Sequence, residues 1–218
     1  ARTYGDGAFT VSATRSSGLP VSFSSGNTSV ATVAGNTVTI VGAGTAVITA
    51  TQAGDATYNP ASASQTLTVN KASATVSLSG LSATYNGAAK SVSVTTSPAS
   101  LPVNVTYNGS SSAPVNAGSY AVVATITSAN YSGSANGTLV IGKANQTISF
   151  SALANKTYGD AASSLSGTSS SGLPVSFSSG NASVATVSGS TLTVVGAGSV
   201  FITAAQAGNS NYNAAASV

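Results

Sequence analysis

Apolar and polar residues alternate along many short stretches of the chain, and turn residues separate these stretches. Residues 37–41 (TVTIV) and 45–50 (TAVITA) alternate in this way on either side of a Gly-Ala-Gly turn at residues 42–44. A period of two residues is typical of a β-strand with one buried face, so the pair predicts a β-hairpin. Residues 103–107 and 120–126 alternate as well. The pattern therefore predicts an all-β protein.

The chain also repeats itself at a distance of 154 residues. The run GLPVSFSSGN occupies residues 18–27 and returns unchanged at residues 172–181. The shorter run TYGD occupies residues 3–6 and returns at residues 157–160, at the same spacing. A repeat without gaps indicates two copies of one structural module, which we call module A.

A different module, module B, lies between the two copies. Lys71 and Lys143 are 72 residues apart, and each is followed by Ala and a similar strand, at residues 74–78 and 146–150. Six or seven strands in 70 to 80 residues are typical of a small antiparallel sandwich. We therefore expect tandem immunoglobulin-like (Ig-like) β-sandwich modules in a linear array. The predicted modules are residues 1–70 (A), 71–142 (B) and 143–218 (A).

The predicted junctions are short and carry no flexible Gly/Ser tract. Residues 67–72 (LTVNKA) and 139–144 (LVIGKA) run from the last strand of one module into the first strand of the next, which predicts a semi-rigid rod. The first A copy lacks a strand equivalent to residues 146–150, and the second lacks one equivalent to residues 65–69. Either the chain is a slice of a longer array, or a neighbouring chain supplies these strands.

Both module types resemble known bacterial families. Module A resembles the bacterial Ig-like group 2 family at residues 19–27, 30–33 and 41–50. Module B resembles the MBG family at residues 83–87, 107–109, 114–120, 130–133 and 139–144. The resemblance implies a long secreted or surface-anchored bacterial protein, often an adhesin, in which such modules serve as stalks. Neither family implies a fixed catalytic site.

The composition argues against most catalytic and nucleic-acid-binding functions. Charged residues make up 4% of the chain, with six Lys or Arg, three Asp, and no His, Cys or Glu. Acid–base hydrolysis relies on His, Cys or paired carboxylates, so we expect no enzyme, no catalytic residues and no cofactor. Six dispersed cations do not form the basic stripe that nucleic acid requires. No run of about 18 apolar residues is present, so we expect no membrane span in this segment. We also expect no leader peptide at its start.

The few candidate site residues favour structural roles. Asp6 and Asp160 occupy the same repeat position in separate modules, in a Tyr-Gly-Asp context that is typical of a turn. Calcium needs several carboxylates, whereas the first copy offers only Asp6 and Asp55, and Asn209 replaces Asp55 in the second copy. We therefore expect no metal site.

Two further possibilities are weaker still. A Lys–Asn isopeptide bond needs a nearby acid, which Lys90 lacks, and the counterpart of Lys156 is Arg2. Tyrosines can stack on sugars, but four of the eight recur with the A module, which favours packing. These four are Tyr4, Tyr58, Tyr158 and Tyr212.

Two functional classes stay open. The first is a structural repeat segment of an extracellular bacterial surface protein that forms a semi-rigid stalk, filament or sheath. The alternative is an adhesive module that recognises a glycan or a cell-surface partner. Because charges that normally prevent edge-to-edge pairing are scarce, we expect the partners to be adjacent modules or other copies of the chain, associated sideways.

Overall fold

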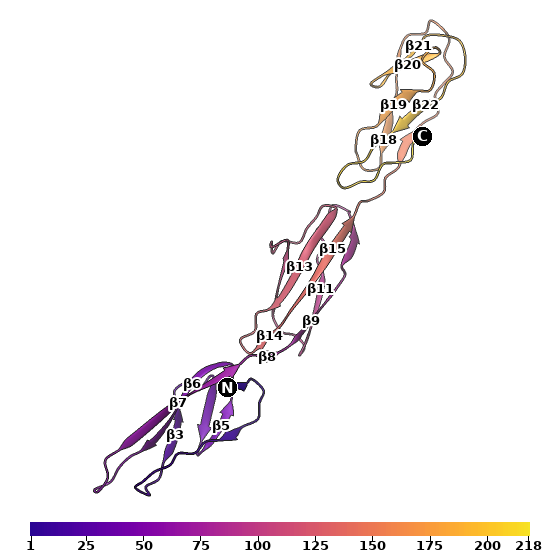
Figure 1. The fold of residues 1–218 in the computed structure, drawn as a ribbon. Coiled ribbons are helices and arrows are strands. Elements are labelled where there is room, and N and C mark those ends of the chain that lie inside the picture. Colours follow the sequence, from indigo (N-terminus) through magenta and orange to yellow (C-terminus); the bar gives the residue numbers. More distant parts are fainter. The chain divides into compact units, whose positions relative to one another are not determined.

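The chain folds into strands and loops without a helix, which confirms the predicted all-β class (Figure 1). The structure, a computed structural model, describes all residues 1–218. Two compact units divide the chain. Unit 1 comprises Ala1–Ser79, Val92–Ser112 and Ala121–Gly137, and unit 2 comprises Gly80–Ser91, Ala113–Tyr120 and Thr138–Val218. Both units take in part of the predicted module B, and the module boundaries at residues 70/71 and 142/143 stay predictions.

The first copy of the repeat, in unit 1, is built from two sheets. One has the order β1 (Arg2–Thr3), β7 (Ala61–Asn70), β6 (Gly44–Gln52), β3 (Ser22–Ser25), and the other has the order β2 (Phe9–Thr10), β5 (Thr37–Ile40), β4 (Ala31–Ala34). β6 and β7 are antiparallel over their whole length, from Gly44↔Val69 to Gln52↔Ala61. β1 is parallel to the end of β7.

The predicted hairpin between residues 37–41 and 45–50 is wrong. Both stretches are strands, but β5 pairs with β4 and β2, whereas β6 pairs with β3 and β7. The Gly-Ala-Gly connection therefore carries the chain from one sheet to the other. The physical reason is burial, because Val38 of β5 and Ala46 and Ile48 of β6 belong to one core cluster that both sheets must cover.

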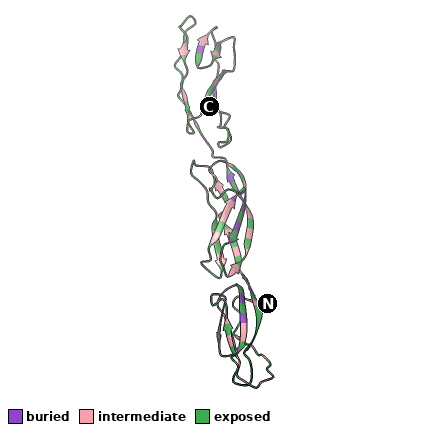
Figure 2. Cartoon of the chain, turned by 90° about the vertical axis from the view of Figure 1, so that its left-hand side faces the viewer, coloured by how far each residue is buried: buried purple, intermediate pink, exposed green.

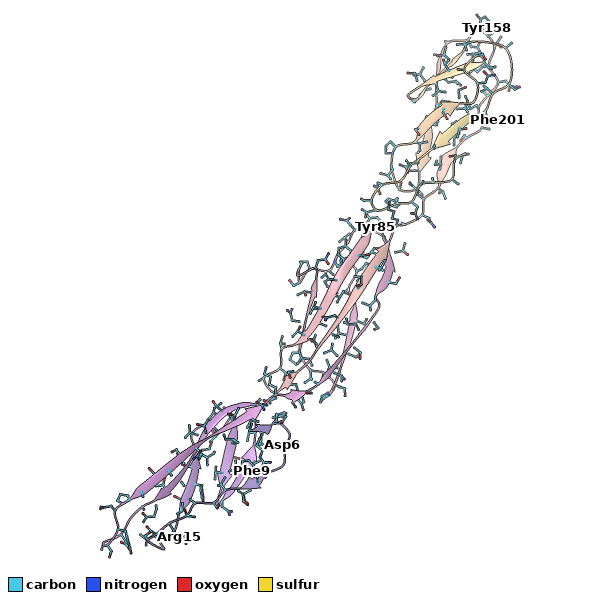
Figure 3. The ribbon with its side chains drawn as sticks, viewed as in Figure 1. Asp6, Phe9, Arg15, Tyr85, Tyr158 and Phe201 are labelled. Carbon is cyan, nitrogen blue, oxygen red and sulfur yellow. The ribbon has the colours of Figure 1, made fainter.

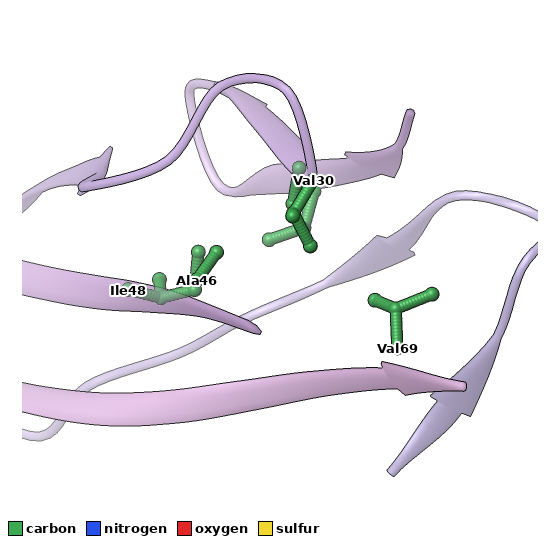
Figure 4. Close-up of a cluster of buried hydrophobic side chains, with 6 residues drawn as sticks. Val30, Ala46, Ile48 and Val69 are labelled. Atoms are coloured by element: carbon green, nitrogen blue, oxygen red, sulfur yellow. The ribbon is translucent and has the colours of Figure 1, made fainter. Parts of the chain in front are cut away.

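This core lies between the two sheets of the first copy. Ala46 and Ile48 from β6, Val69 from β7 and Val30 point toward one another in Figure 4, and all are at most 9% exposed. Figure 2 shows the buried residues as short purple segments. The alternation of the sequence thus becomes one more buried and one solvated face on strands such as β3 and β4.

The remaining strands of unit 1 come from the predicted module B. They are β8 (Ala72–Ser73), β9 (Thr75–Ser79), β11 (Ser93–Ser97), β12 (Val103–Tyr107) and β14 (Tyr131–Ser132), with parts of β13 (Gly118–Ile126) and β15 (Ser134–Gly142). β9 pairs with β11 and β12 with β13, both antiparallel, whereas β8 and β14 are parallel. β13 and β15 each continue from one unit into the other.

Unit 2 contains the second copy of the repeat. Its strands are β10 (Ser82–Thr84), β16 (Ile148–Phe150), β17 (Ser163–Ser164), β18 (Gly167–Ser169), β19 (Ser176–Ser179), β20 (Ala185–Ser188), β21 (Thr191–Val194) and β22 (Ile202–Ala205), with the end of β15. β10 is parallel to β15, and β16–β18, β17–β21–β20 and β19–β22 pair antiparallel. Leu165, Ala185 and Leu192 form its core.

Candidate functional site

The same arrangement of side chains occurs once in each unit, at the point where a Lys-Ala pair follows a long strand. We call these arrangements joint 1 and joint 2. Joint 1, in unit 1, consists of Tyr4, Ala43, Lys71, Ala72, Ser128, Asn130 and Tyr131. Joint 2, in unit 2, consists of Tyr85, Ala117, Lys143, Ala144, Asn209, Asn211 and Tyr212.

Parallel strand pairing places the first tyrosine of each joint. β1 runs beside the end of β7, and the backbone N–H of Tyr4 donates to the carbonyl of Asn70 at 2.9 Å. β10 runs beside the end of β15, and the N–H of Tyr85 donates to the carbonyl of Gly142 at 2.8 Å. Each tyrosine is therefore fixed directly next to the last residue before the Lys-Ala pair.

An aromatic pair forms the centre of each joint. The ring centroids of Tyr4 and Tyr131 are 5.4 Å apart with an interplanar angle of 82°. Those of Tyr85 and Tyr212 are 5.4 Å apart at 83°. Edge-to-face tyrosine pairs of this geometry stabilise by about 0.5–1.5 kcal/mol beyond the area that they bury.

An asparagine amide completes each contact by accepting a backbone hydrogen bond. The N–H of Ala43 donates to Oδ1 of Asn130 at 2.8 Å, and the N–H of Ala117 donates to Oδ1 of Asn211 at 2.9 Å. Both alanines stand immediately before the glycine that begins the next strand, β6 or β13. The bond satisfies a partly buried backbone donor that has no partner in a sheet.

The Lys-Ala pair is tied down by both side chain and backbone. Nζ of Lys71 donates to the carbonyl of Ser128, and Nζ of Lys143 donates to the carbonyl of Asn209, both at 2.7 Å. The N–H of Ala72 donates to the carbonyl of Asn130, and that of Ala144 to the carbonyl of Asn211, both at 2.9 Å.

A close backbone approach lies two residues beyond Ala72 and Tyr131 of joint 1, between Ala74 and Gly133. A Cβ added to Gly133 would lie 2.1 Å from the carbonyl oxygen of Ala74, so only glycine fits there. In each joint three hydrogen bonds from backbone N–H groups, one hydrogen bond from a lysine ammonium group and one aromatic pair thus converge. Such a set of contacts holds two segments in a fixed arrangement.

The acids lie apart from the joints' contacts, in turns. Oδ2 of Asp6 accepts the N–H of Thr3 at 2.9 Å, and Oδ2 of Asp160 accepts the N–H of Thr157 at 2.8 Å, which confirms the turn prediction. Oδ1 of Asp55 accepts the N–H groups of Thr57 and Tyr58, at 2.7 and 2.8 Å.

The exchange of Asp55 for Asn209 is explained by this acceptor role. Oδ1 of Asn209 accepts the N–H groups of Asn211 and Tyr212, at 2.8 and 2.9 Å. The turn needs one oxygen and no charge. No group of three or more His, Cys, Asp or Glu side chains gathers anywhere in the structure.

The other residues weighed from the sequence do not converge. Lys90 contributes its backbone N–H to the carbonyl of Pro114, and Lys156 is exposed in a loop. Tyr4 and Tyr212 lie in joints, whereas their repeat counterparts Tyr158 and Tyr58 are 69% and 46% exposed (Tyr158 is labelled in Figure 3).

The repeat of 154 residues does not point to the joints, because their residues belong to features that A and B share and not to the match between the two A copies. Both types carry a Thr-Tyr pair and, further along the module, an Ala-Gly pair. The Thr-Tyr pairs are residues 3–4, 84–85 and 157–158, and the Ala-Gly pairs are residues 43–44, 117–118 and 197–198. A search for features that A and B share would have found these residues.

Comparison with known proteins identifies one segment. Residues 74–145 match the family described as MBG domain, which confirms the resemblance of the middle module. MBG domains are found in surface and adhesin-type proteins, which fits a structural or adhesive role. No curated protein matches the chain. None of the structure's elements is a helix of the length and apolarity needed to cross a membrane.

Proposed function

We propose that this chain is a structural repeat segment of an extracellular bacterial surface protein, in which A modules of the bacterial Ig-like group 2 type alternate with MBG-type modules. The segment acts as a semi-rigid spacer in a stalk, filament or sheath, without catalytic activity. The observation that carries the proposal is the recurrence of one joint chemistry between an A and a B segment in unit 1 and between a B and an A segment in unit 2.

A joint that serves both orders of modules is what an extendable array requires. At joint 1 the A segment contributes Tyr4 and Ala43, and at joint 2 the B segment contributes Tyr85 and Ala117 in the same geometry. Because each module type presents both halves of the contact, A and B can alternate without a special connector. The exposed Tyr158 is then an unused half of the same joint.

The setting follows from the MBG match and from composition. A chain with 4% charged residues and 69 Ser or Thr residues is suited to sideways packing of polar faces between copies. We propose such lateral association outside the cell, at the bacterial surface.

Distance measurements across joint 1 test the spacer function. The chain has no cysteine, so Ser24→Cys and Thr95→Cys, both at exposed positions of unit 1, give a unique pair of spin-label sites. Electron paramagnetic resonance should show one narrow distance distribution. Combining Asn130→Ala with Tyr131→Ala should broaden it, since both side-chain contacts of the joint are lost.

The matched control is Asn104→Ala, an exposed asparagine on β12, which should leave the distribution narrow. A distribution that is already broad before any joint substitution would refute the spacer function. The adhesive alternative predicts retention of the chain on a glycan array or on host cells. The spacer function predicts none.

A further inference from the structure

Tyrosine is the only readily oxidised side chain in this sequence. The chain contains eight tyrosines and no cysteine, methionine, tryptophan or histidine. Cysteine and methionine are the side chains that oxidants modify most often in proteins, and neither is present to compete. An oxidant that removes single electrons from this chain therefore acts on its phenol rings.

Four of the eight tyrosines form the edge-to-face pairs at the centres of the joints. The ring centroids of Tyr4 and Tyr131 are 5.4 Å apart, and those of Tyr85 and Tyr212 are also 5.4 Å apart. With interplanar angles of 82° and 83°, the edge of one ring meets the face of the other at this separation. Each joint therefore holds two phenol rings in contact.

Backbone hydrogen bonds fix both rings of a pair. In joint 1 the N–H of Tyr4 donates to the carbonyl of Asn70, and the carbonyl of Asn130, next to Tyr131, accepts the N–H of Ala72, both at 2.9 Å. The corresponding bonds of joint 2 are 2.8 and 2.9 Å long. All four tyrosines are nevertheless partly exposed. The pairs are thus held together by the fold and stay within reach of an oxidant in solution.

Two tyrosines outside the pairs provide an internal comparison. Tyr58 and Tyr158 are 46% and 69% exposed, and neither belongs to a joint pair. Tyr107, by contrast, is 6% exposed. Exposure alone therefore favours oxidation of Tyr58 and Tyr158, whereas contact between rings favours coupling in the joints.

We propose that each joint is a site of oxidative coupling, at which a one-electron oxidant of the peroxidase class joins the two tyrosines into dityrosine. Hydrogen peroxide is the final electron acceptor. The coupling needs only the geometry of the joints and does not depend on the spacer function.

The reaction balances with peroxide as the co-reactant. Each tyrosine gives up one electron and its phenolic proton, which leaves two phenoxyl radicals. The radicals combine at the ring carbons next to the C–O carbons and form one C–C bond. The two hydrogens on these carbons leave as protons, and the two phenolic oxygens are protonated again. The pair thus loses two electrons and two protons, which reduce one hydrogen peroxide to two water molecules.

Coupling would convert each joint from a noncovalent contact into a covalent one. The new bond links β1 to β14 in joint 1, and β10 to the segment around Tyr212 in joint 2. A crosslink between distant positions of a chain stabilises mainly because it restricts the unfolded state. A chain without cysteine obtains in this way the covalent link that a disulfide supplies in other extracellular proteins.

Oxidation of the 218-residue chain by a haem peroxidase and hydrogen peroxide tests the proposal. The product is denatured, digested with trypsin and analysed by mass spectrometry. Trypsin places the two partners of each pair in different peptides. Coupling should join residues 3–15 to residues 91–143, and residues 72–90 to residues 157–218. Each product should be lighter than its two peptides together by two hydrogen atoms.

At low chain concentration and low conversion, these two links should exceed every link through Tyr58 or Tyr158 at least about tenfold, because rings in contact need no encounter. Tyr131→Phe should abolish the first link and spare the second, and Tyr212→Phe should do the reverse. Phenylalanine keeps the ring in place but has no phenolic hydrogen to lose. Tyr58→Phe is the matched control and should spare both links.

Links that follow exposure, with Tyr58 and Tyr158 as the main partners, would overturn the proposal. So would a link that persists after its own Tyr131→Phe or Tyr212→Phe substitution. Oxidation in concentrated urea gives the reference for the unfolded chain. Equal selectivity in urea would show that contact in the joints does not direct the coupling.

Hydrogen exchange tests whether coupling locks the joints. The N–H groups of Ala72 and Ala144 donate within the joints and should exchange at least about tenfold more slowly in the coupled chain, because local opening is blocked. The N–H of Val11, which donates to Asn36, is the control and should keep its rate. Unchanged exchange at both alanines would refute the locking effect.

Discussion

Strand β6 of the first copy spans nine residues, Gly44–Gln52, whereas its counterpart β22 in the second copy spans four, Ile202–Ala205. β6 pairs along both edges, with β3 and β7, whereas β22 pairs with β19. Val47 is 45% exposed and its counterpart Phe201 is 87% exposed (Figure 3). The comparison teaches that the segment paired along both edges forms the longer strand, while the two segments also differ at four of their nine residues.

The turns behave differently from the strands. The Tyr-Gly-Asp turns at Asp6 and Asp160 make the same hydrogen bond in both copies, because that bond lies within four residues. Yet Tyr4 packs against the core of its copy, while Tyr158 is 69% exposed. Local hydrogen bonds follow the sequence alone, and burial follows the surroundings.

The largest effect should come from charging the last strand of the first copy. Val69 is 2% exposed in that core, so Val69→Asp should lower the stability of the first copy by at least about 3 kcal/mol and leave the second copy folded. Urea unfolding followed through NMR signals of each copy measures this. Val47→Asp, at a half-exposed position, is the control, and simultaneous unfolding of both copies would contradict the assignment.

Substitution of the repeat-equivalent glutamines Gln52 and Gln206 should change stability in different directions. Gln206→Leu removes the acceptor of Gln146 and should cost about 1–2 kcal/mol. Gln52→Leu removes an unpartnered buried donor, so stability should stay equal or rise. Chemical denaturation of the two variants decides. Equal losses would mean that Gln52 is bonded in solution.

The tyrosines should show a smaller contrast. Tyr131→Ala breaks the aromatic pair of joint 1 and should cost about 1 kcal/mol, whereas Tyr158→Ala should stay within about 0.5 kcal/mol of the parent. Thermal unfolding of both variants gives the comparison. A larger loss at Tyr158 would show that its exposed ring has a partner.

The smallest effect should come from the turn at Asp55. Asp55→Asn keeps the Oδ1 acceptor that Asn209 supplies in the second copy, so stability should change by less than about 0.5 kcal/mol. Asp55→Ala loses both backbone bonds and should cost about 1 kcal/mol. If denaturation shows a comparable loss for Asp55→Asn, the carboxylate charge itself matters.

Strand positions were predictable from alternation, and their partners were not. The stretches at residues 103–107 and 120–126 are strands, as expected, because alternation reports which face is buried. Alternation does not indicate which strands pair with each other. The hairpin predicted from β5 and β6 was therefore wrong, since the two strands belong to different sheets. The joints were unpredictable from either repeat alone, since Tyr4 meets Tyr131 and Tyr85 meets Tyr212, partners from unlike sequences.

The hydrogen bonds of the Lys-Ala pairs also affect how easily proteases can cut the chain. Proteases cut where a linker can detach and adopt an extended conformation in the enzyme's cleft, and linkers between domains are usually the first such places. Here Lys71 and Lys143 have their ammonium groups held by carbonyls, and the N–H of the next residue is engaged in each case. Trypsin cleaves after lysine and arginine, and the chain has six such residues. Two of the six, Lys71 and Lys143, are held by hydrogen bonds. Digestion at the joints should require that they open first.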